Sequence, residues 1–201
     1  MKSHFFGALL GFLLGAYVTL VYVIPVQALT WGRTEAKSFV SGAQYEPYVL
    51  TGGWWSDDNI PTTPANFGNT RSEGVDCSGL VFKAWQMSTT IGSTSLELRN
   101  AYDDVHGPYQ AASFYGGCSG ACSTVCQAGS GTCPYTSTNT MDAFAVLKGN
   151  AGFTENHIGL IYSELSNGQD SIIQAIRPTI TISTQSWRTK PGFRGIKRNG
   201  W

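Results

Sequence analysis

Apolar and polar positions recur with a helical period in two segments of the first half of the chain. The pattern predicts one helix over residues 34–42, which Gly42 can end, and a second over 77–87. The apolar residues that share a face within each helix are Ala36, Phe39 and Val40 in the first, and Leu80, Val81, Ala84 and Trp85 in the second. Residues 54–70 are rich in Pro, Asn, Asp and Thr and predict a loop.

The second half of the chain carries the short apolar runs that are typical of strands. These runs predict strands at residues 143–147, 158–162, 172–176, 179–182 and 193–197. Ser166-Asn167-Gly168 lies between the second and third runs and is a hairpin-turn signal. Residues 88–140 show little periodicity and are interpreted as an insertion. Helices followed by consecutive short strands predict an α+β fold, with N-terminal helices packed on an antiparallel sheet.

The N-terminal segment has the pattern of an export signal. Residues 5–24 are almost wholly apolar after a single Lys2, and small residues for cleavage follow at Val26 and Ala28. The run is also long enough to span a bilayer, so residues 1–28 are either a signal peptide or an N-terminal membrane anchor. The charge bias places the remainder, a single domain over 29–201, outside the cytoplasm in both cases. We therefore expect a periplasmic, cell-envelope or extracellular protein.

The composition narrows the range of partners. Formal net charge over the 201 residues is zero, and charged residues make up 13% of the chain. Without a basic excess, the sequence predicts no nucleic-acid partner. We find neither an internal repeat nor a nucleotide-binding glycine motif, and no cofactor is expected.

The five cysteines divide into a cluster of four and one that stands alone. In an exported chain, disulfides persist, and four cysteines can pair in three ways. The alternative for the cluster is a zinc site, but its C-x3-C-x3-C-x6-C spacing differs from the paired C-x2-C motifs of structural zinc sites. We expect no metal and one odd thiol, Cys77. The disulfide candidates are Cys118, Cys122, Cys126 and Cys133.

Cys77 is the candidate nucleophile. Asp76-Cys77-Ser78-Gly79 opens the second predicted helix, where the macrodipole and unpaired N–H groups favour thiolate over thiol. The structural alternatives are a small buried hydrophobe and one half of a disulfide.

Two polar residues on the predicted strands are candidate partners for this thiol. His157 opens one strand, from which it could take the thiol proton and later protonate a leaving amine. Gln174 lies among aliphatic residues of the next strand and could orient the imidazole as the third member of a triad. The structural alternatives are a core histidine with satisfied hydrogen bonds and a water-facing glutamine. Of the other histidines, His4 lies in the export segment and His106 in a turn-like context.

These motifs together resemble the NlpC/P60 family, papain-like cysteine peptidases of bacterial cell-wall peptides. The likeness covers about residues 33–198 apart from 88–140. It rests on Tyr48-Val49 with Gly52-Gly53, Asp76-Cys77-Ser78-Gly79-Leu80-Val81, His157-Ile158-Gly159-Leu160-Ile161-Tyr162 and Gln174-Ala175. The order of cysteine, histidine and polar residue is that of the family.

The resemblance implies a papain-like fold in which a helix bearing Cys77 packs on a five- or six-stranded antiparallel sheet. It implies hydrolysis of peptidoglycan stem peptides, commonly between γ-D-glutamyl and a diamino acid. Asp76 and Ser78 match positions that bind the free amine of a peptide, and Tyr48 matches an active-site tyrosine. Met141-Asp142 stands where the family usually has Gly-Asp. The family often has histidine at the position of Gln174, and the region 88–140 is longer than usual.

Other functions fit the same residues. One is N-acetylmuramoyl-L-alanine amidase activity; another is an antibacterial toxin, for which an immunity or inhibitor protein is an expected partner. A catalytically inactive cell-wall binding module is the alternative outside the enzymes. Residues 5–24 would add membrane anchoring where the segment is retained.

Overall fold

A computed structural model describes residues 30–56, 72–128 and 133–201. The chain divides into two units, residues 1–30 and 31–201, and the description below concerns the second. The predicted export segment 1–28 lies outside the described residues, as does most of the predicted loop 54–70. In the part of the chain that is described, no helix is long and apolar enough to cross a membrane.

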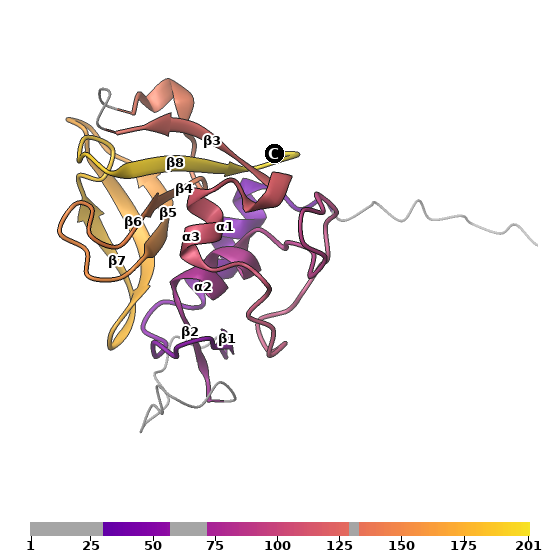
Figure 1. The fold of residues 1–201 in the computed structure, drawn as a ribbon. Coiled ribbons are helices and arrows are strands. Elements are labelled where there is room, and N and C mark those ends of the chain that lie inside the picture. Colours follow the sequence, from indigo (N-terminus) through magenta and orange to yellow (C-terminus); the bar gives the residue numbers. More distant parts are fainter. Residues whose placement is uncertain (1–29, 57–71, 129–132) are drawn as a thin grey trace, which may run out of the picture. The chain divides into compact units, whose positions relative to one another are not determined.

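Six antiparallel strands form the main sheet, in the order β3-β8-β4-β5-β6-β7 (Figure 1). The five predicted strands are confirmed, and a sixth, β3, joins the sheet at its edge beside β8. The strands are β3 (Cys122–Gln127), β4 (Ala143–Val146), β5 (His157–Glu164), β6 (Asp170–Ile176), β7 (Thr179–Gln185) and β8 (Phe193–Arg198).

The hairpin between β5 and β6 turns where the sequence predicts it. Asn167 and Gly168 have φ angles of 61° and 75°. A two-residue turn of this kind matches the twist of the strands that it joins, and Asn-Gly tolerates it best. Next to the turn Glu164 pairs with Asp170, and a register shift between Ile161 and Ser163 then brings Leu160 opposite Ile173.

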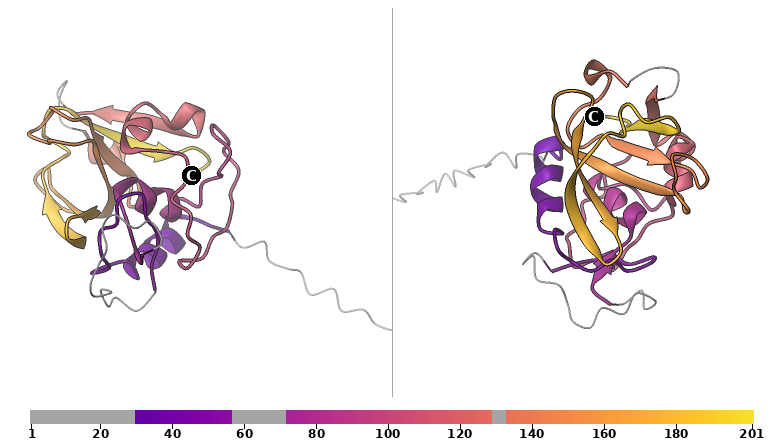
Figure 2. Two further views of the ribbon diagram at one scale, coloured as in Figure 1. Left: turned by 60° about the horizontal axis from the view of Figure 1, so that its bottom comes forward. Right: turned by 90° about the vertical axis from the view of Figure 1, so that its left-hand side faces the viewer.

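The helices lie together on one face of the main sheet (Figures 1 and 2). Helix α2 begins at Cys77, as predicted, but ends at Ala84, before the predicted Met87. Gln86 has a φ of 47°, which is incompatible with further helix. The helical elements are α1 (Arg33–Ser41), α2 (Cys77–Ala84) and α3 (Ala111–Tyr115), with short 3₁₀ turns η1 (Cys118–Gly120) and η2 (Tyr135–Ser137). Strands β1 (Gly53–Trp54) and β2 (Gly74–Val75) form a separate two-stranded sheet.

Both faces of the main sheet are covered by apolar side chains. Alternate residues of a strand point to opposite faces. On the helix-covered face the cluster includes Ala143, Ala145, Ile158, Leu160, Ile173 and Ala175. The other face carries a second cluster with Phe144, Val146, Ile161, Ile172, Trp187 and Phe193. Residues of the loops that follow β4 and β7 pack on this second face, and the central strand β4 is buried along its whole length.

The region 88–140, interpreted from the sequence as an insertion stapled by disulfides, packs into the fold and contains both disulfides. It supplies β3 to the main sheet and α3 to the helical layer, where Phe114 is fully buried against Trp85. Helix α3 has five residues, too few for a periodic pattern to be visible in the sequence.

The four clustered cysteines form disulfides, as predicted. Cys118 pairs with Cys122 and Cys126 with Cys133, whereas Cys77 remains a free thiol. The pairing excludes the zinc alternative for the cluster, because zinc binds thiolates. Disulfides are compatible with an exported protein.

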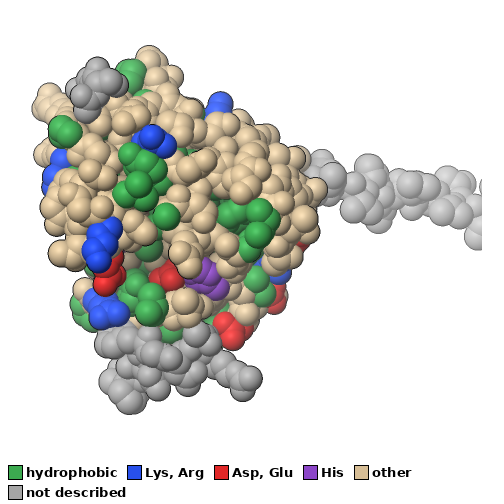
Figure 3. Space-filling view, in the orientation of Figure 1, with side chains coloured by type: hydrophobic (Ala, Val, Ile, Leu, Met, Phe, Trp, Pro, Cys, Tyr) green, Lys and Arg blue, Asp and Glu red, His purple; other side chains and the backbone are tan. Residues whose placement is uncertain are grey.

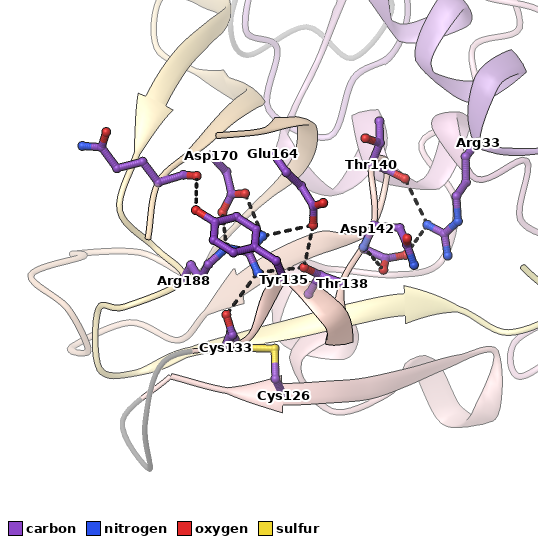
Figure 4. A network of polar contacts seen from close by, with 12 residues as sticks. Arg33, Cys126, Cys133, Tyr135, Thr138, Thr140, Asp142, Glu164, Asp170 and Arg188 are labelled. Atoms are coloured by element: carbon purple, nitrogen blue, oxygen red, sulfur yellow. Dashed lines mark hydrogen bonds and ion pairs between the residues drawn. A yellow bond between two sulfur atoms is a disulfide. The ribbon is translucent and has the colours of Figure 1, made fainter. Parts of the chain in front are cut away.

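Arg188, which follows β7, is buried and links residues 133–138 to the main sheet (Figure 4). Arg188 donates to both carboxylate oxygens of Asp170 at 3.0 and 2.7 Å, and neither side chain is exposed. Its guanidinium also donates to the carbonyl of Cys133 and the hydroxyl of Thr138, and it lies 3.8 Å from the ring centre of Tyr135. The arginine thereby fixes the segment after β7 against η2 and the start of β6.

Candidate active site

Cys77 is the first residue of α2, directly after the helix cap. The Asp76 side chain caps the helix by accepting from the backbone N–H of Gly79 at 2.8 Å. Cys77 is 8% exposed, so only a small part of the side chain is accessible. Backbone groups of Ile158, Ser78 and Cys77 itself lower the pKa of the thiol. The helix cap thus holds the thiol against the first residues of β5.

His157 and Gln174 are hydrogen-bonded to each other on neighbouring strands. His157 Nε2 and Gln174 Oε1 are 2.7 Å apart, and both side chains are buried. The amide of Gln174 in turn donates from Nε2 to the hydroxyl of Ser183 on β7, at 3.1 Å. This contact orients the amide so that its oxygen faces the imidazole.

The hydrogen bond fixes which nitrogen of His157 can act as a base. An amide oxygen only accepts, so the neutral imidazole must carry its proton on Nε2. Nδ1 is then left with a free lone pair. His157 also lies at the end of the sheet, as the first residue of β5, and lines the same cavity as Cys77. The tautomer therefore suits proton transfer from the thiol to Nδ1.

Aromatic rings and a glycine hold the imidazole in place. Phe153 stacks on the His157 ring, with centroids 5.4 Å apart, and Trp187 meets it edge-on at 5.6 Å. A Cβ on Gly159 would approach Trp187 to 2.9 Å and the Cβ of Gln174 to 3.1 Å. The glycine thus leaves the space that these two side chains fill. The sequence analysis did not identify Trp187, which follows β7 without any local motif.

Two cavities flank Cys77. One, of about 350 Å³, is lined by Tyr48, Cys77, His157 and residues of the loop before β5, together with Arg177. The other, of about 370 Å³, is lined by Asp76, Cys77, Ser78 and His106, among others. Tyr48, Cys77, Glu155 and Asn156 line both cavities. A substrate could therefore lie across the thiol, with one part in each cavity.

Burial has the largest effect on the pKa of Cys77, and it favours the neutral thiol. Burial and then the Asp76 charge raise the pKa of the Cys77 thiol to about 12, despite the backbone groups that lower it. Burial lowers the pKa of His157, against the opposing effect of its bond to Gln174. Both shifts favour a neutral thiol and a neutral imidazole at rest. The helix start favours thiolate, as the sequence indicates, but burial and the Asp76 carboxylate outweigh this effect and raise the pKa of the Cys77 thiol.

Asp76 and Ser78 form a second polar cluster with His106. His106 Nε2 is 2.8 Å from Asp76 Oδ1 and 3.2 Å from the hydroxyl of Ser78, which itself donates to Asp76 at 2.9 Å. Burial raises the pKa of Asp76, but its bonds to His106, Gly79 and Thr51 outweigh this and the net shift is downward. Burial likewise lowers the pKa of His106, and Asp76 reverses the shift, so that the pKa is raised. Sequence reasoning missed this role of His106.

Three features position His106 beside the start of α2. The buried ammonium of Lys83 donates to the carbonyls of Asn100 and Asp103, at 2.7 and 2.6 Å, and so holds the preceding loop. At Gly53 an added Cβ would lie 2.4 Å from the backbone nitrogen of His106, so only glycine allows the two segments to approach so closely. Gly107 has a φ of 82° and lies on the ring of Phe82. These long-range contacts leave no local signal in the sequence.

Tyr48, the predicted site tyrosine, is buried between the two cavities. Its ring lies 5.6 Å from the Arg177 guanidinium. Burial, then the negative charges that Cys77 and Asp76 can carry, raise its pKa, so the phenol stays protonated and can act as a hydrogen-bond donor. Arg177 and Glu155 are the basic and acidic side chains of the first cavity. Neither was singled out from the sequence.

Met141 and Asp142 retain the backbone geometry expected at their position. Met141 has a φ of 68°, a conformation that glycine adopts with least strain. Its N–H and carbonyl are both used, in bonds to Ile161 and to the indole of Trp85. Asp142 pairs with Arg33 of α1 (Figure 4). These contacts tie both predicted helices to the start of β4.

The described residues contain no group of three His, Cys, Asp or Glu side chains placed to hold a metal ion. On the face shown in Figure 3, charged side chains are scattered and form no continuous patch of either sign. Comparisons with protein-family models, with curated protein sequences and with solved structures find no match.

Proposed function

We propose that this chain is an exported cysteine hydrolase that cleaves an amide bond in peptidoglycan stem peptides. The observation that carries the proposal is the arrangement of the three polar residues: Cys77 and His157 line one cavity, and Gln174 fixes the tautomer of His157. A core histidine would also need a hydrogen-bond partner such as Gln174, but it would not need to share a solvent-accessible cavity with a free thiol. The order of these residues along the chain, and the motifs around them, resemble the NlpC/P60 cysteine peptidases.

The reaction begins with a neutral pair. His157 Nδ1 takes the proton of Cys77 as the sulfur attacks the carbonyl carbon of the amide. N–H groups at the start of α2, including that of Cys77, are placed to stabilise the oxyanion, an effect whose loss typically costs about 10²–10³ in rate. The C–N bond then breaks, and the amine leaves with the proton held by His157. Water, deprotonated by Nδ1, hydrolyses the thioester and regenerates the thiol.

The setting supports an extracytoplasmic substrate. The two disulfides favour an oxidising compartment, and the apolar segment at residues 5–24 is a signal or an anchor for export. Among the substrates outside the cytoplasm, the resemblance favours the bond between γ-D-glutamyl and a diamino acid. Arg177 lines the cavity of His157 and could pair with a carboxylate on the diamino acid.

Digestion of purified peptidoglycan, followed by mass spectrometry of the released fragments, tests this proposal. A new amine on the diamino acid is expected for the endopeptidase, whereas a free L-alanine amine on an intact stem would indicate the amidase. Cys77→Ala should reduce the release by at least about 10³-fold. Circular dichroism of the variant serves as the control for folding. Full activity in a folded Cys77→Ala variant would contradict the assignment of the nucleophile.

A further inference from the structure

The cavity on the Asp76 side of Cys77 is the place where the acyl half of a substrate must lie. His157 protonates the departing amine, so the amine half occupies the cavity that His157 lines. The carbonyl carbon that Cys77 attacks belongs to the other half. That half extends into the cavity lined by Asp76, Ser78 and His106. This inference rests on the proposed function and specifies its substrate.

The carboxylate in this cavity has its hydrogen-bonding capacity largely used. Asp76 Oδ1 accepts from Gly79 N at 2.8 Å, from Ser78 Oγ at 2.9 Å and from His106 Nε2 at 2.8 Å, and Oδ2 accepts from Thr51 N at 3.0 Å. Asp76 is 5% exposed. A substrate ammonium could reach it only by displacing His106. Both ring nitrogens of His106 face acceptors, Asp76 Oδ1 at 2.8 Å and the Gly107 carbonyl at 2.9 Å, an arrangement that favours the charged imidazolium and therefore repels a second cation. Glu155 also lines the cavity, but it is exposed, and water screens its attraction for an ammonium.

We propose that His106 makes this cavity selective for an acyl half whose N-terminus is amide-linked and uncharged, and that it excludes a free ammonium group. The expected substrates are stem peptides still joined to the glycan through an amide, and not peptides already released with a free N-terminal amine. His106 is a specificity-determining residue in this scheme, and Asp76 is its partner. The assignment differs from direct capture of a free amine by Asp76 and Ser78, which the family resemblance implies.

Two synthetic stem peptides of identical sequence test the proposal, one with a free N-terminal amine and one N-acetylated. The wild-type protein should cleave the acetylated peptide with a kcat/KM about tenfold or more above that for the free amine. His106→Ala frees the Asp76 carboxylate, so the kcat/KM ratio should shift toward the free amine by at least about tenfold. The double variant His106→Ala/Asp76→Asn should lose this shift. His106→Gln, which keeps a donor without the charge, should fall between wild type and His106→Ala.

Three outcomes would overturn the inference. A wild-type preference for the free amine would contradict it directly. An equal loss of activity on both peptides in His106→Ala and His106→Gln would assign His106 a purely structural role. Failure of the wild-type protein to cleave either peptide or peptidoglycan would instead overturn the proposed function, and the inference with it.

Discussion

At the scale of single residues, the reactivity of Cys77 is decided by its surroundings. The start of a helix favours thiolate, but the thiol is buried and lies beside the Asp76 carboxylate, and both effects raise its pKa. His157 is buried among aromatic rings, which disfavours the imidazolium. Cys77 and His157 are therefore both neutral until the attack on a substrate transfers the thiol proton to the imidazole. Catalysis by proton transfer needs a neutral His157. As the pH is lowered, kcat/KM should therefore decline only at a pH below the usual pKa of histidine.

Alkylation of Cys77 by iodoacetamide tests this neutral pair. We expect slow labelling at pH 5–7 and a rate that rises with pH, because the thiolate forms only as the raised pKa is approached. The rate is followed by mass spectrometry, which also identifies the labelled residue. Fast labelling that is independent of pH down to pH 4 would show a resting thiolate–imidazolium pair instead.

The Asp76–His106 pair should stabilise the fold within a defined pH window. His106 has a raised pKa in the folded state, so its contribution is present below its usual value of 6.5 and is lost as pH rises through the folded value. Asp76 has a lowered pKa, so its contribution is present above its usual value of 3.8 and is lost as pH falls through the folded value. Urea unfolding of wild type and His106→Ala should differ most between about pH 4 and 6.5. A difference that stays constant from pH 4 to 8 would refute the ion pair.

At the scale of elements, the β5–β6 hairpin brings two of the site residues together. Leu160 pairs with Ile173, and continuing this register puts Gly159 opposite Gln174, with His157 on the diagonal. Because Gly159 has no side chain, Gln174 can lean toward the imidazole, and Trp187 can cover their hydrogen bond. The sequence predicts this hairpin from Asn167-Gly168 and from the strand patterns on either side.

Gly159→Ala should therefore lower both stability and activity. The added methyl group would clash with Ile172 at 2.7 Å and Trp187 at 2.9 Å, an overpacking that costs about 1–3 kcal/mol. Urea unfolding and kcat/KM measure the two effects. Gly116→Ala is the matched control, since its nearest atoms would lie at 3.6 Å and its φ of −85° suits alanine. Equal behaviour of the two variants would contradict the packing role of Gly159.

At the scale of the whole described unit, distant segments are tied together through Arg188. Its guanidinium contacts the start of β6, η2 and the Cys133 end of a disulfide loop, while the preceding residue, Trp187, packs on His157. The ion pair with Asp170 is fully buried, and burial still leaves the pKa of Asp170 raised although Arg188 opposes the shift. The segment that shields the site is thus anchored by a contact to another part of the sheet.

Removing this anchor should destabilise the fold strongly. Asp170→Ala leaves a buried guanidinium without its main partner, which costs about 3–5 kcal/mol. Glu164→Ala is the control, because Glu164 meets Arg188 at 3.3 Å with a side chain that is 31% exposed, and such a pair contributes about 0–1 kcal/mol. Thermal or urea unfolding of both variants measures the difference. Similar losses in the two variants would contradict the dominant role of Asp170.

The sequence by itself determined the elements and the candidate triad. Strand and helix periodicity, the Asn-Gly turn and the count of cysteines are local patterns, and the structure confirms the five predicted strands and the pairing of the four clustered cysteines. Cys77, His157 and Gln174 each stand in a recognisable local context.

Only the tertiary structure decided the edge strand β3, the contacts of His106, the cover by Trp187 and the buried Arg188. Each of these depends on contacts between residues far apart in the chain, and burial then raises the pKa of Cys77 against the effect of the helix start. Local periodicity carries no information on which distant segment will approach a given side chain, or on how much water will remain around it.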